Sequence, residues 1–307
     1  MINYSVIIPA YNIENYVAKL NIFINNINNQ RNDVEFILIN DGSTDNTQKC
    51  LKNIAKIIYV EQENQGVSSA RNLGLKIATG DWILFLDADD EFSSNIFDKL
   101  DLIEKNTSLI SFNYRINSSI VNKNLSSGIY DNSFLLNIFL TKKNNFSICC
   151  FCYKKEFLLE NNLFFEEGYA LGEDIHFLLK ALLFAPKINY TDDILFEYNL
   201  HTGSAVNSKI SYEKLIILKL YNTLDDLFIR LKDQEYYNFV YFKSWTYLYL
   251  IKKIITHGLD DNLSNSIYKY KFELINQLRK SKSLRKKLLH ISLIHIFTFI
   301  FTLLKTK

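Results

Sequence analysis

The sequence predicts an α/β fold with a mostly parallel sheet flanked by helices, followed by a helical region toward the C-terminus. Strand-like and helical segments alternate over the first hundred residues, which is typical of parallel sheets. The strand-like runs are almost wholly apolar, as expected of strands buried on both faces. From about residue 212 onward, apolar residues recur at spacings of three and four, the pattern of packed helices. With 307 residues, the chain can bury one large core or one domain with a smaller annex.

Four strands are expected in the first hundred residues, over 5–8, 34–39, 57–60 and 82–86, of which the first and fourth are expected to be buried. Helical spacing occupies the intervening segments, at 13–27, after a cap at Ser43 or Asp45, and at 68–78. In a parallel α/β sheet, ligands bind at the carboxyl ends of the strands. We therefore expect the functional site in the segments that follow these four strands.

The second half of the chain has a mixed pattern that becomes helical. Further strands are expected near 109–114 and 146–153, and a helix follows Glu173 and Asp174. Later, one helical face is marked by Ile217, Leu220, Leu224, Phe228 and Leu231, and an aromatic stripe runs over 236–255. We interpret the stripe as packing surface because no basic groove accompanies it. These patterns predict an α/β domain over residues 1–208 and a helical extension over 209–307.

Composition excludes several classes of protein. Hydrophobic residues make up 48% and charged residues 22%, which argues against wholesale disorder. The formal net charge is +2, whereas nucleic-acid binding proteins carry a much larger basic excess, so no nucleic-acid partner is expected. The glycines do not form G-x-G-x-x-G after the first strand, which argues against a dinucleotide-dependent dehydrogenase.

The four cysteines are poorly placed for a disulfide framework. Cys149 and Cys150 are adjacent, Cys152 follows closely, and Cys50 is remote. We expect reduced thiols and no structural zinc site. The N-terminus enters a strand without a basic segment or a cleavage site, so a cytoplasmic location is expected.

An acidic cluster follows the fourth strand. Asp87-Ala88-Asp89 places two carboxylates at positions i and i+2, from which both can approach one hard divalent cation. A nucleotide diphosphate supplies further oxygens, and the cation neutralises charge on the departing diphosphate. The alternative is an acidic turn that caps the next helix.

Three further polar clusters precede or follow the other strands. They are Pro9-Ala10-Tyr11-Asn12, Asn40-Asp41-Gly42-Ser43, and the segment from Asn64 to Asn72 that contains Arg71. Considered one at a time, each cluster has an alternative interpretation. Asp41-Gly42 is then an ordinary turn, Tyr11 a packing residue and Arg71 a surface charge. Taken together, the clusters are expected to converge at one edge of the sheet.

These motifs resemble glycosyltransferase family 2, whose catalytic domain has the GT-A fold. The family's P-x-Y-N, D-G-S-x-D, N-x-G-x-x-x-A-R-N and G-D-[YWF]-[IVL]-x-F-L-D-x-D-D patterns match segments that begin at Pro9, Asp41, Asn64 and Gly80. The resemblance is strong over residues 1–100 and continues more weakly to about 208.

The resemblance implies a role for each matched residue in binding the donor. Pro9, Ala10 and Tyr11 would line the nucleoside pocket, Asp41 would accept from the N3–H of uracil, and Arg71 would lie near the base or diphosphate. Asn64, Asp87 and Ala88 would also contact the nucleotide sugar. The cation, Mn²⁺ or Mg²⁺, would be held by Asp89 and Asp87, with His201 as a further ligand.

The acidic pair Glu173-Asp174 fits the position of the family's catalytic base. A single displacement at the anomeric carbon needs a base within hydrogen-bond reach of the acceptor hydroxyl. By resemblance, Asp174 is that base and Glu173 positions the acceptor. The alternative is that both are helix N-terminal acids stabilised by the macrodipole.

The resemblance implies an inverting transfer of one hexose or N-acetylhexosamine from a UDP-sugar to a hydroxyl of a glycan, in bacterial glycan assembly. The acceptor is expected to be a glycan or a lipid-linked oligosaccharide. A non-catalytic nucleotide-sugar-binding subunit of a glycan assembly complex is the alternative.

The C-terminal segment favours a membrane surface. A basic cluster over 279–287 precedes an apolar run over 288–304, which suits the cytoplasmic face of an anionic inner membrane. The alternatives are internal packing and a homodimer formed through the C-terminal helices.

Overall fold

The computed structural model describes residues 1–199, 216–231, 233–257, 263–280, 290–296 and 298–299. The chain divides into two compact units. Unit 1 comprises Met1–Leu135, Asn145–Gly168 and Glu173–His201, and unit 2 comprises Leu136–Asn144, Tyr169–Gly172 and Thr202–Lys307. The boundary expected at residue 208 lies outside the described residues and stays a prediction.

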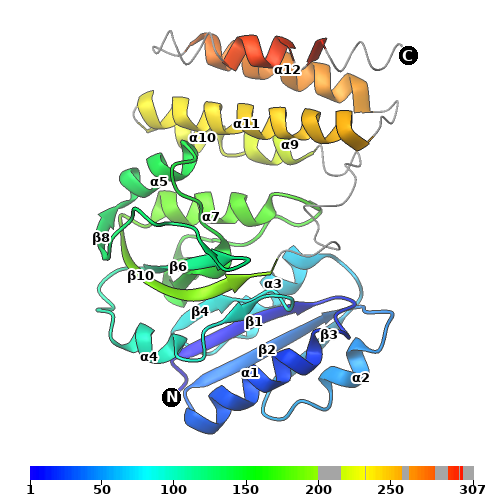
Figure 1. The fold of residues 1–307 in the computed structure, drawn as a ribbon, viewed down its shortest axis with the longest axis vertical. Helices are drawn as coiled ribbons and strands as arrows, with labels where there is room; N and C mark the ends of the chain where they lie inside the picture. The colour runs from blue at the N-terminus through cyan, green and yellow to red at the C-terminus, as the bar shows by residue number, and fades with distance from the viewer. Residues whose placement is uncertain (200–215, 232, 258–262, 281–289, 297, 300–307) are drawn as a thin grey trace. The chain divides into compact units, whose positions relative to one another are not determined.

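Unit 1 contains a mixed sheet of ten strands within its described residues, in the order β3-β2-β1-β4-β9-β6-β10-β5, with β7 beside β6 and β8 beside β10 (Figure 1). The strands are β1 Tyr4–Ala10, β2 Val34–Asp41, β3 Ile58–Gln62, β4 Trp82–Phe85, β5 Glu91–Phe92, β6 Leu109–Ile116, β7 Ser119–Ile120, β8 Gly128–Asp131, β9 Phe151–Lys154 and β10 Lys187–Tyr198. Strands β1 to β4 are mutually parallel, and β6 is parallel to β10. The remaining pairs are antiparallel. The carboxyl ends of β1 to β4 therefore meet at one edge of the sheet.

Helices cover both faces of this parallel part. Phe36 of β2 packs edge-on against Phe23 of α1 (Val17–Gln30), with ring centroids 5.9 Å apart. On the other face, Ile7 of β1 lies so close to α3 (Val67–Ile77) that a Cβ added to Gly74 would come within 2.3 Å of it. Because both faces are covered, β1, β2 and β4 are nearly continuous buried runs rather than alternating ones, whereas β3 at the sheet edge has no buried residue. The other helices of unit 1 are α2 Thr47–Leu51, α4 Ile96–Asp101, α6 Lys155–Glu160 and α7 Glu173–Phe184, and α5 Asn132–Leu140 spans the boundary between the units.

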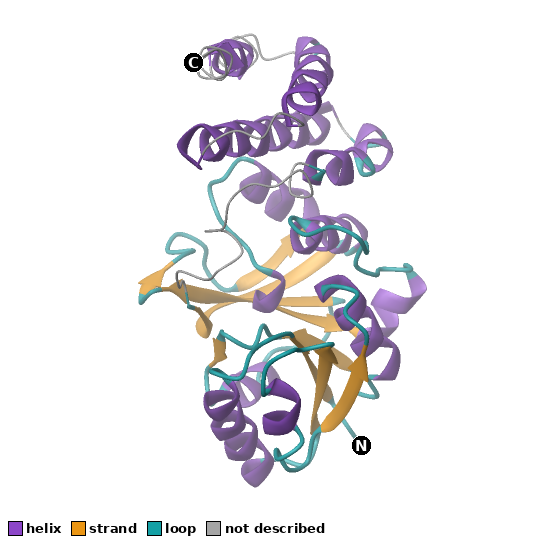
Figure 2. Ribbon diagram, turned by 90° about the vertical axis from the view of Figure 1, so that its right-hand side faces the viewer, coloured by secondary structure: helices purple, strands orange, loops and turns teal. Residues whose placement is uncertain are grey.

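From residue 216 onward the described residues of unit 2 are mainly helical (Figure 2). The helices are α9 Ile217–Asn222, α10 Asp225–Ile229, α11 Asp233–His257 and α12 Leu263–Arg279. Within this unit the buried ammonium of Lys243 on α11 lies against Asp225 of α10 and 3.1 Å from the Asn222 side chain of α9, which ties the three helices together. The aromatic stripe on α11 includes the buried side chains of Phe239, Phe242 and Tyr247, in keeping with its interpretation as packing surface.

Several expected boundaries were wrong. The strand expected over 146–153 begins only at Phe151, because Ser147 accepts from the backbone N–H of Cys149 and starts a 3₁₀ turn over Ile148–Cys150. The first helix begins at Val17 rather than at residue 13, since the backbone N–H groups of residues 12–14 donate to the side chains of Ser43, Thr47 and Asp45. The single helical face over 217–231 is two short helices, and β10 was missed because Asp192 and Asp193 interrupt its apolar pattern.

Candidate active site

The loops that follow β1 and β2 are held together by hydrogen bonds. The backbone N–H of Asn12 donates to Ser43 Oγ at 3.0 Å, and the N–H of Thr44 donates back to Asn12 Oδ1 at 2.8 Å. Asn12 adopts a left-handed conformation with φ of 54°, which asparagine tolerates better than most residues. Just before it, Ala10 is buried and Tyr11 is 50% exposed, so the tyrosine ring is available to a ligand.

Asp41 organises the segment between β3 and α3. Its buried carboxylate accepts from the Gln62 side chain at 2.7 Å and from the backbone N–H groups of Gln65 and Gly66 at 2.8 and 2.9 Å. A carboxylate offers about four lone-pair positions, so about one remains for a further donor. The remaining position could accept the N3–H of the predicted uracil. The three hydrogen bonds also hold the segment between β3 and α3 in place, a role of Asp41 that the sequence did not reveal.

Asn64 lies beside the turn that follows Asp41. Gly42 has φ of 68°, and a Cβ placed on it would lie 2.7 Å from the backbone nitrogen of Asn64. Only glycine fits both this conformation and this approach. The exposed Asn64 thus lies next to Gly42, the residue that follows Asp41.

Arg71 connects the two halves of the predicted site. Its side chain is only 4% exposed, and its Nη2 donates to Asp87 Oδ1 at 2.7 Å while Nη1 lies 3.5 Å from Glu173 Oε1. The guanidinium also lies over the Phe165 ring, 5.2 Å from its centroid. Burial lowers the pKa of Arg71, but the Asp87 and Glu173 carboxylates raise it well above its usual range, so the charge is retained.

The acidic cluster after β4 contains three carboxylates of different burial. Asp87 and Asp89 are half-buried, whereas Asp90 is 6% exposed. Asp90 Oδ1 accepts from the backbone N–H of Asn199 at 2.9 Å, and the Asn199 side chain donates to the Asp89 carbonyl at 3.0 Å. Burial, reinforced by the charge of Asp87, raises the pKa of Asp90 to about 8. Sequence reasoning assigned no role to Asp90, although it stands next to the D-x-D pair.

The second acidic pair begins helix α7. Glu173 is 8% exposed, and burial, followed by the charge of Asp174, raises its pKa to about 7. Asp174 is half-buried, and burial raises its pKa as well. Its Oδ1 accepts from the N–H of Ile175 at 2.7 Å. Both groups are thus poised to hold or release a proton nearer to neutral pH than ordinary carboxyls.

Tyr198, at the end of β10, shows that these acids share one neighbourhood. Burial and then the charges of Asp90, Asp89, Asp87 and Asp174 raise the pKa of its hydroxyl to about 12. All four carboxylates therefore lie within electrostatic range of one tyrosine. Sequence reasoning missed this residue, because nothing in its local pattern distinguishes it from other strand tyrosines.

The oxygen-rich cluster fits a divalent cation. Carboxylate oxygens are the ligands that Mg²⁺ and Mn²⁺ prefer. Asp90 Oδ2 is buried and has no hydrogen-bond partner among the described residues, so it lacks the donor or cation that a buried carboxylate oxygen requires. His201, the third predicted cation ligand, lies outside the described residues.

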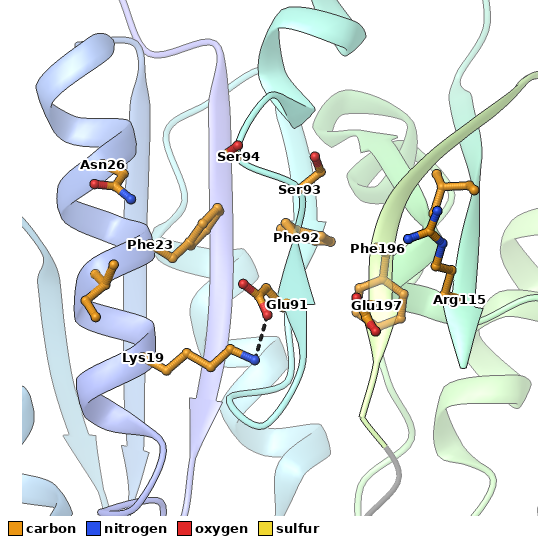
Figure 3. A pocket seen from close by; sticks show the side chains of 12 residues that line it. Lys19, Phe23, Asn26, Glu91, Phe92, Ser93, Ser94, Arg115, Phe196 and Glu197 are labelled. Atoms are coloured by element: carbon orange, nitrogen blue, oxygen red, sulfur yellow. Dashed lines mark ion pairs between the residues drawn. The ribbon is translucent and has the colours of Figure 1, made fainter. Parts of the chain in front are cut away.

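A separate groove lies between α1 and the β5–β10 pair (Figure 3). Its volume is about 370 Å³, and Lys19 and Glu91 form an ion pair across it at 2.6 Å. Phe23, Phe92 and Phe196 contribute to its lining. Its lining includes no side chain that the sequence predicted for the site.

Comparison with known protein families identifies the family to which the chain belongs. The family described as glycosyl transferase family 2 matches residues 5–161, slightly more than half of the 307 residues. The chain belongs to glycosyl transferase family 2. The predicted membership is therefore confirmed.

Solved structures confirm the expected GT-A fold of this family-2 chain. Staphylococcus aureus TarS (residues 1–349, in complex with UDP-GlcNAc) superposes with a TM-score of 0.66 and 18% identity, covering 90% of this chain and 80% of that one. The mannosyltransferase PcManGT of Pyrobaculum calidifontis, in complex with GDP-Man and Mn²⁺, gives a TM-score of 0.57 at 15% identity, covering 99% of this chain and 88% of the other.

Curated relatives of the family-2 chain are bacterial glycosyltransferases. Glycosyltransferase GlyA of Streptococcus pneumoniae is 28% identical over 92% of this chain. The uncharacterized glycosyltransferase EpsJ of Bacillus subtilis is 28% identical over 65% of it. The chain spans 42% of GlyA and 62% of EpsJ, less than two thirds of either.

Proposed function

We propose that this chain is an inverting, cation-dependent transferase that moves one hexose or N-acetylhexosamine from a UDP-sugar to a hydroxyl of a glycan acceptor. The observation that carries the proposal is the position of Arg71. It joins Asp87 of the donor-side D-x-D motif to Glu173 of the acceptor-side acidic pair, through contacts of 2.7 and 3.5 Å. A transferase needs both sets of groups close together, because the bond to one substrate breaks as the bond to the other forms.

The donor nucleoside is assigned to the loops after β1 and β2. Tyr11 offers an exposed ring, and Asp41 keeps about one accepting position free after its three internal hydrogen bonds. Pro9, Ala10 and Asn64 complete this side of the proposed pocket. TarS, which shares the fold, has been solved with UDP and with UDP-GlcNAc, and this supports a uridine donor.

Asp87 and Asp89 are the proposed ligands of Mn²⁺ or Mg²⁺. Such a cation, when bound, neutralises negative charge on the departing diphosphate. Arg71 holds one oxygen of Asp87 and leaves the other oxygen of that carboxylate for the cation or the donor. Ala88 lies buried between the two aspartates.

Asp174 is the proposed base and takes the proton of the acceptor hydroxyl. Its raised pKa increases its affinity for that proton, which suits a base working near neutral pH. Glu173, whose Oε1 lies 3.5 Å from Arg71 Nη1, would position the acceptor. Attack on the face opposite the leaving diphosphate inverts the anomeric configuration.

A glycan or lipid-linked oligosaccharide at the cytoplasmic membrane surface is the proposed acceptor. Its support is the basic and apolar composition of residues 279–307. Among the described helices, none combines the length and hydrophobicity needed to span a bilayer. Binding of the full chain to anionic vesicles, compared with neutral ones, tests this part separately.

UDP release tests the proposed function. The full chain is incubated with UDP-glucose, UDP-galactose and their N-acetyl forms, with and without Mn²⁺ or Mg²⁺. We expect cation-dependent UDP release from one of these donors. UDP binding without release from any of them, in the presence of glycan acceptors, would instead favour a non-catalytic nucleotide-sugar-binding subunit.

A further inference from the structure

Cys149 lies beside the acidic cluster after β4. One ligand atom each from Asp87, Asp90 and Cys149 lies within 4.8 Å of the others. Cys149 is 1% exposed, whereas the Asp87 side chain is 34% exposed and gives access from solvent. Cys149 and Cys152 have the spacing of a C-x-x-C pair, yet only Cys149 belongs to this cluster.

Two features distinguish the cluster from an ordinary acidic turn. Asp90 is more than nine-tenths buried, and its Oδ2 has no hydrogen-bond partner within the described residues. Leaving such an oxygen unsatisfied is costly, and a cation would satisfy it. The thiol adds a sulfur ligand, which Mg²⁺ and Mn²⁺ sites rarely contain but which zinc-class ions favour.

We propose that Asp87, Asp90 and Cys149 form a binding site for a thiophilic divalent cation of the zinc class. Zn²⁺ binds thiolate sulfur at about 2.3 Å and carboxylate oxygen at about 2.0–2.2 Å in tetrahedral geometry, so its ligand atoms lie about 3.3–3.7 Å apart. The three atoms, which lie within 4.8 Å of one another, therefore need to close by at most about 1.5 Å. On binding, the Cys149 thiol and the Asp90 carboxyl lose their protons to solvent, and the cation takes the place of these protons.

The site shares Asp87 with the oxygen ligands proposed for Mn²⁺ or Mg²⁺. A zinc-class ion would therefore compete for that carboxylate, a consequence that rests on the proposed function. The binding site itself does not depend on transferase activity. Its test is accordingly a binding measurement on the chain alone.

Cadmium, a spectroscopic substitute for zinc, reports the thiolate ligand directly. The full chain carrying Cys50→Ser, which removes the half-exposed thiol, is titrated with Cd²⁺ while the sulfur-to-cadmium charge-transfer absorbance is recorded. We expect the band to saturate at one equivalent. Cys149→Ala should abolish it, and Cys150→Ala, the matched control at an equally buried neighbour, should retain it.

Two further measurements keep the test decisive if Cys149→Ala folds poorly. Asp90→Asn preserves the thiol and the side-chain volume, and should weaken Cd²⁺ binding by about tenfold or more. Zinc X-ray absorption on the chain with all four cysteines should show one sulfur neighbour at about 2.3 Å together with oxygen neighbours. A full band in folded Cys149→Ala, or no band and no sulfur neighbour in the parent chain, would overturn the proposal.

Discussion

Arg71 Nη2 donates to Asp87 Oδ1 at 2.7 Å, although the arginine side chain is only 4% exposed. The pair joins helix α3 to the segment after β4, two elements that the sequence places at the same edge of the sheet. A buried guanidinium is stable only where carboxylates and other contacts replace its hydration. Here Asp87, Glu173 and the Phe165 ring provide that replacement.

Replacing Arg71 by methionine is expected to destabilise the protein by about 3 kcal/mol, because it leaves the buried Glu173 carboxylate and the half-buried Asp87 carboxylate without their counter-charge. Thermal or denaturant unfolding measures the change. The matched control is Lys19→Met, which removes the exposed ion pair to Glu91 and should change stability by only about 0–1 kcal/mol. Equal losses of stability in the two variants would contradict a structural role for the contacts of Arg71 with Asp87 and Glu173.

Replacing Asp41 by asparagine should weaken UDP binding by about 5- to 150-fold, equivalent to about 1–3 kcal/mol. The amide cannot accept from Gln62, Gln65, Gly66 and uracil at once, since its nitrogen is a donor. Calorimetric titration with UDP gives the affinity. Asp81→Asn, an exposed change before the opposite end of β4, should leave binding unaltered; an unaltered affinity in Asp41→Asn as well would remove Asp41 from the nucleoside site.

Transfer should slow as the pH falls through the raised pKa values of the Glu173–Asp174 pair. Burial and the charge of Asp174 raise the pKa of Glu173 to about 7, and the two carboxyls titrate as a pair. A base must be ionised to accept the acceptor proton, so the active form is lost as pH falls through the raised pKa. In Glu173→Gln the acidic limb of the kcat/KM profile should move to lower pH, because Asp174 loses a like-charged neighbour. A profile that is flat between about pH 5.5 and 8 would speak against this assignment.

Mn²⁺ together with UDP should raise the melting temperature, and a chelator should reverse the increase. A ligand present at a hundredfold excess over its Kd stabilises the folded chain by about 2.7 kcal/mol. Asp89→Asn removes a proposed cation ligand, so this variant should lose most of the Mn²⁺-dependent increase in melting temperature. Glu166→Asn, a change at a half-exposed carboxylate outside the cluster, should retain it. A chelator-independent increase would contradict a cation at Asp89.

The parallel part of the sheet and most of the site loops were predictable from the sequence. Strands β1, β2 and β4 are apolar runs. A short run of β-branched residues such as Val6-Ile7-Ile8 is typical of a strand that is buried on both faces. The turn at Asp41-Gly42 also has a local signature. These features depend on neighbours in the chain, so local pattern carries the information.

The contacts that complete the site were not predictable in this way. Arg71 and Glu173 are separated by 102 positions, and their contact depends on how β9, α7 and Phe165 pack. Cys149 reaches the acidic cluster through a 3₁₀ turn that the apolar run over 146–153 concealed. Tyr198 and Asn199 come from a long strand whose pattern is interrupted by aspartates. In each instance tertiary packing, rather than local propensity, decides the outcome.

The most direct test of the account compares UDP binding with UDP release in Asp174→Asn. With the donor identified, a saturating cation and an acceptor present, this variant should bind UDP with the affinity of the parent chain but release UDP about 10²- to 10⁴-fold more slowly. Unchanged release would show that Asp174 does not take the acceptor proton and would contradict the proposed mechanism.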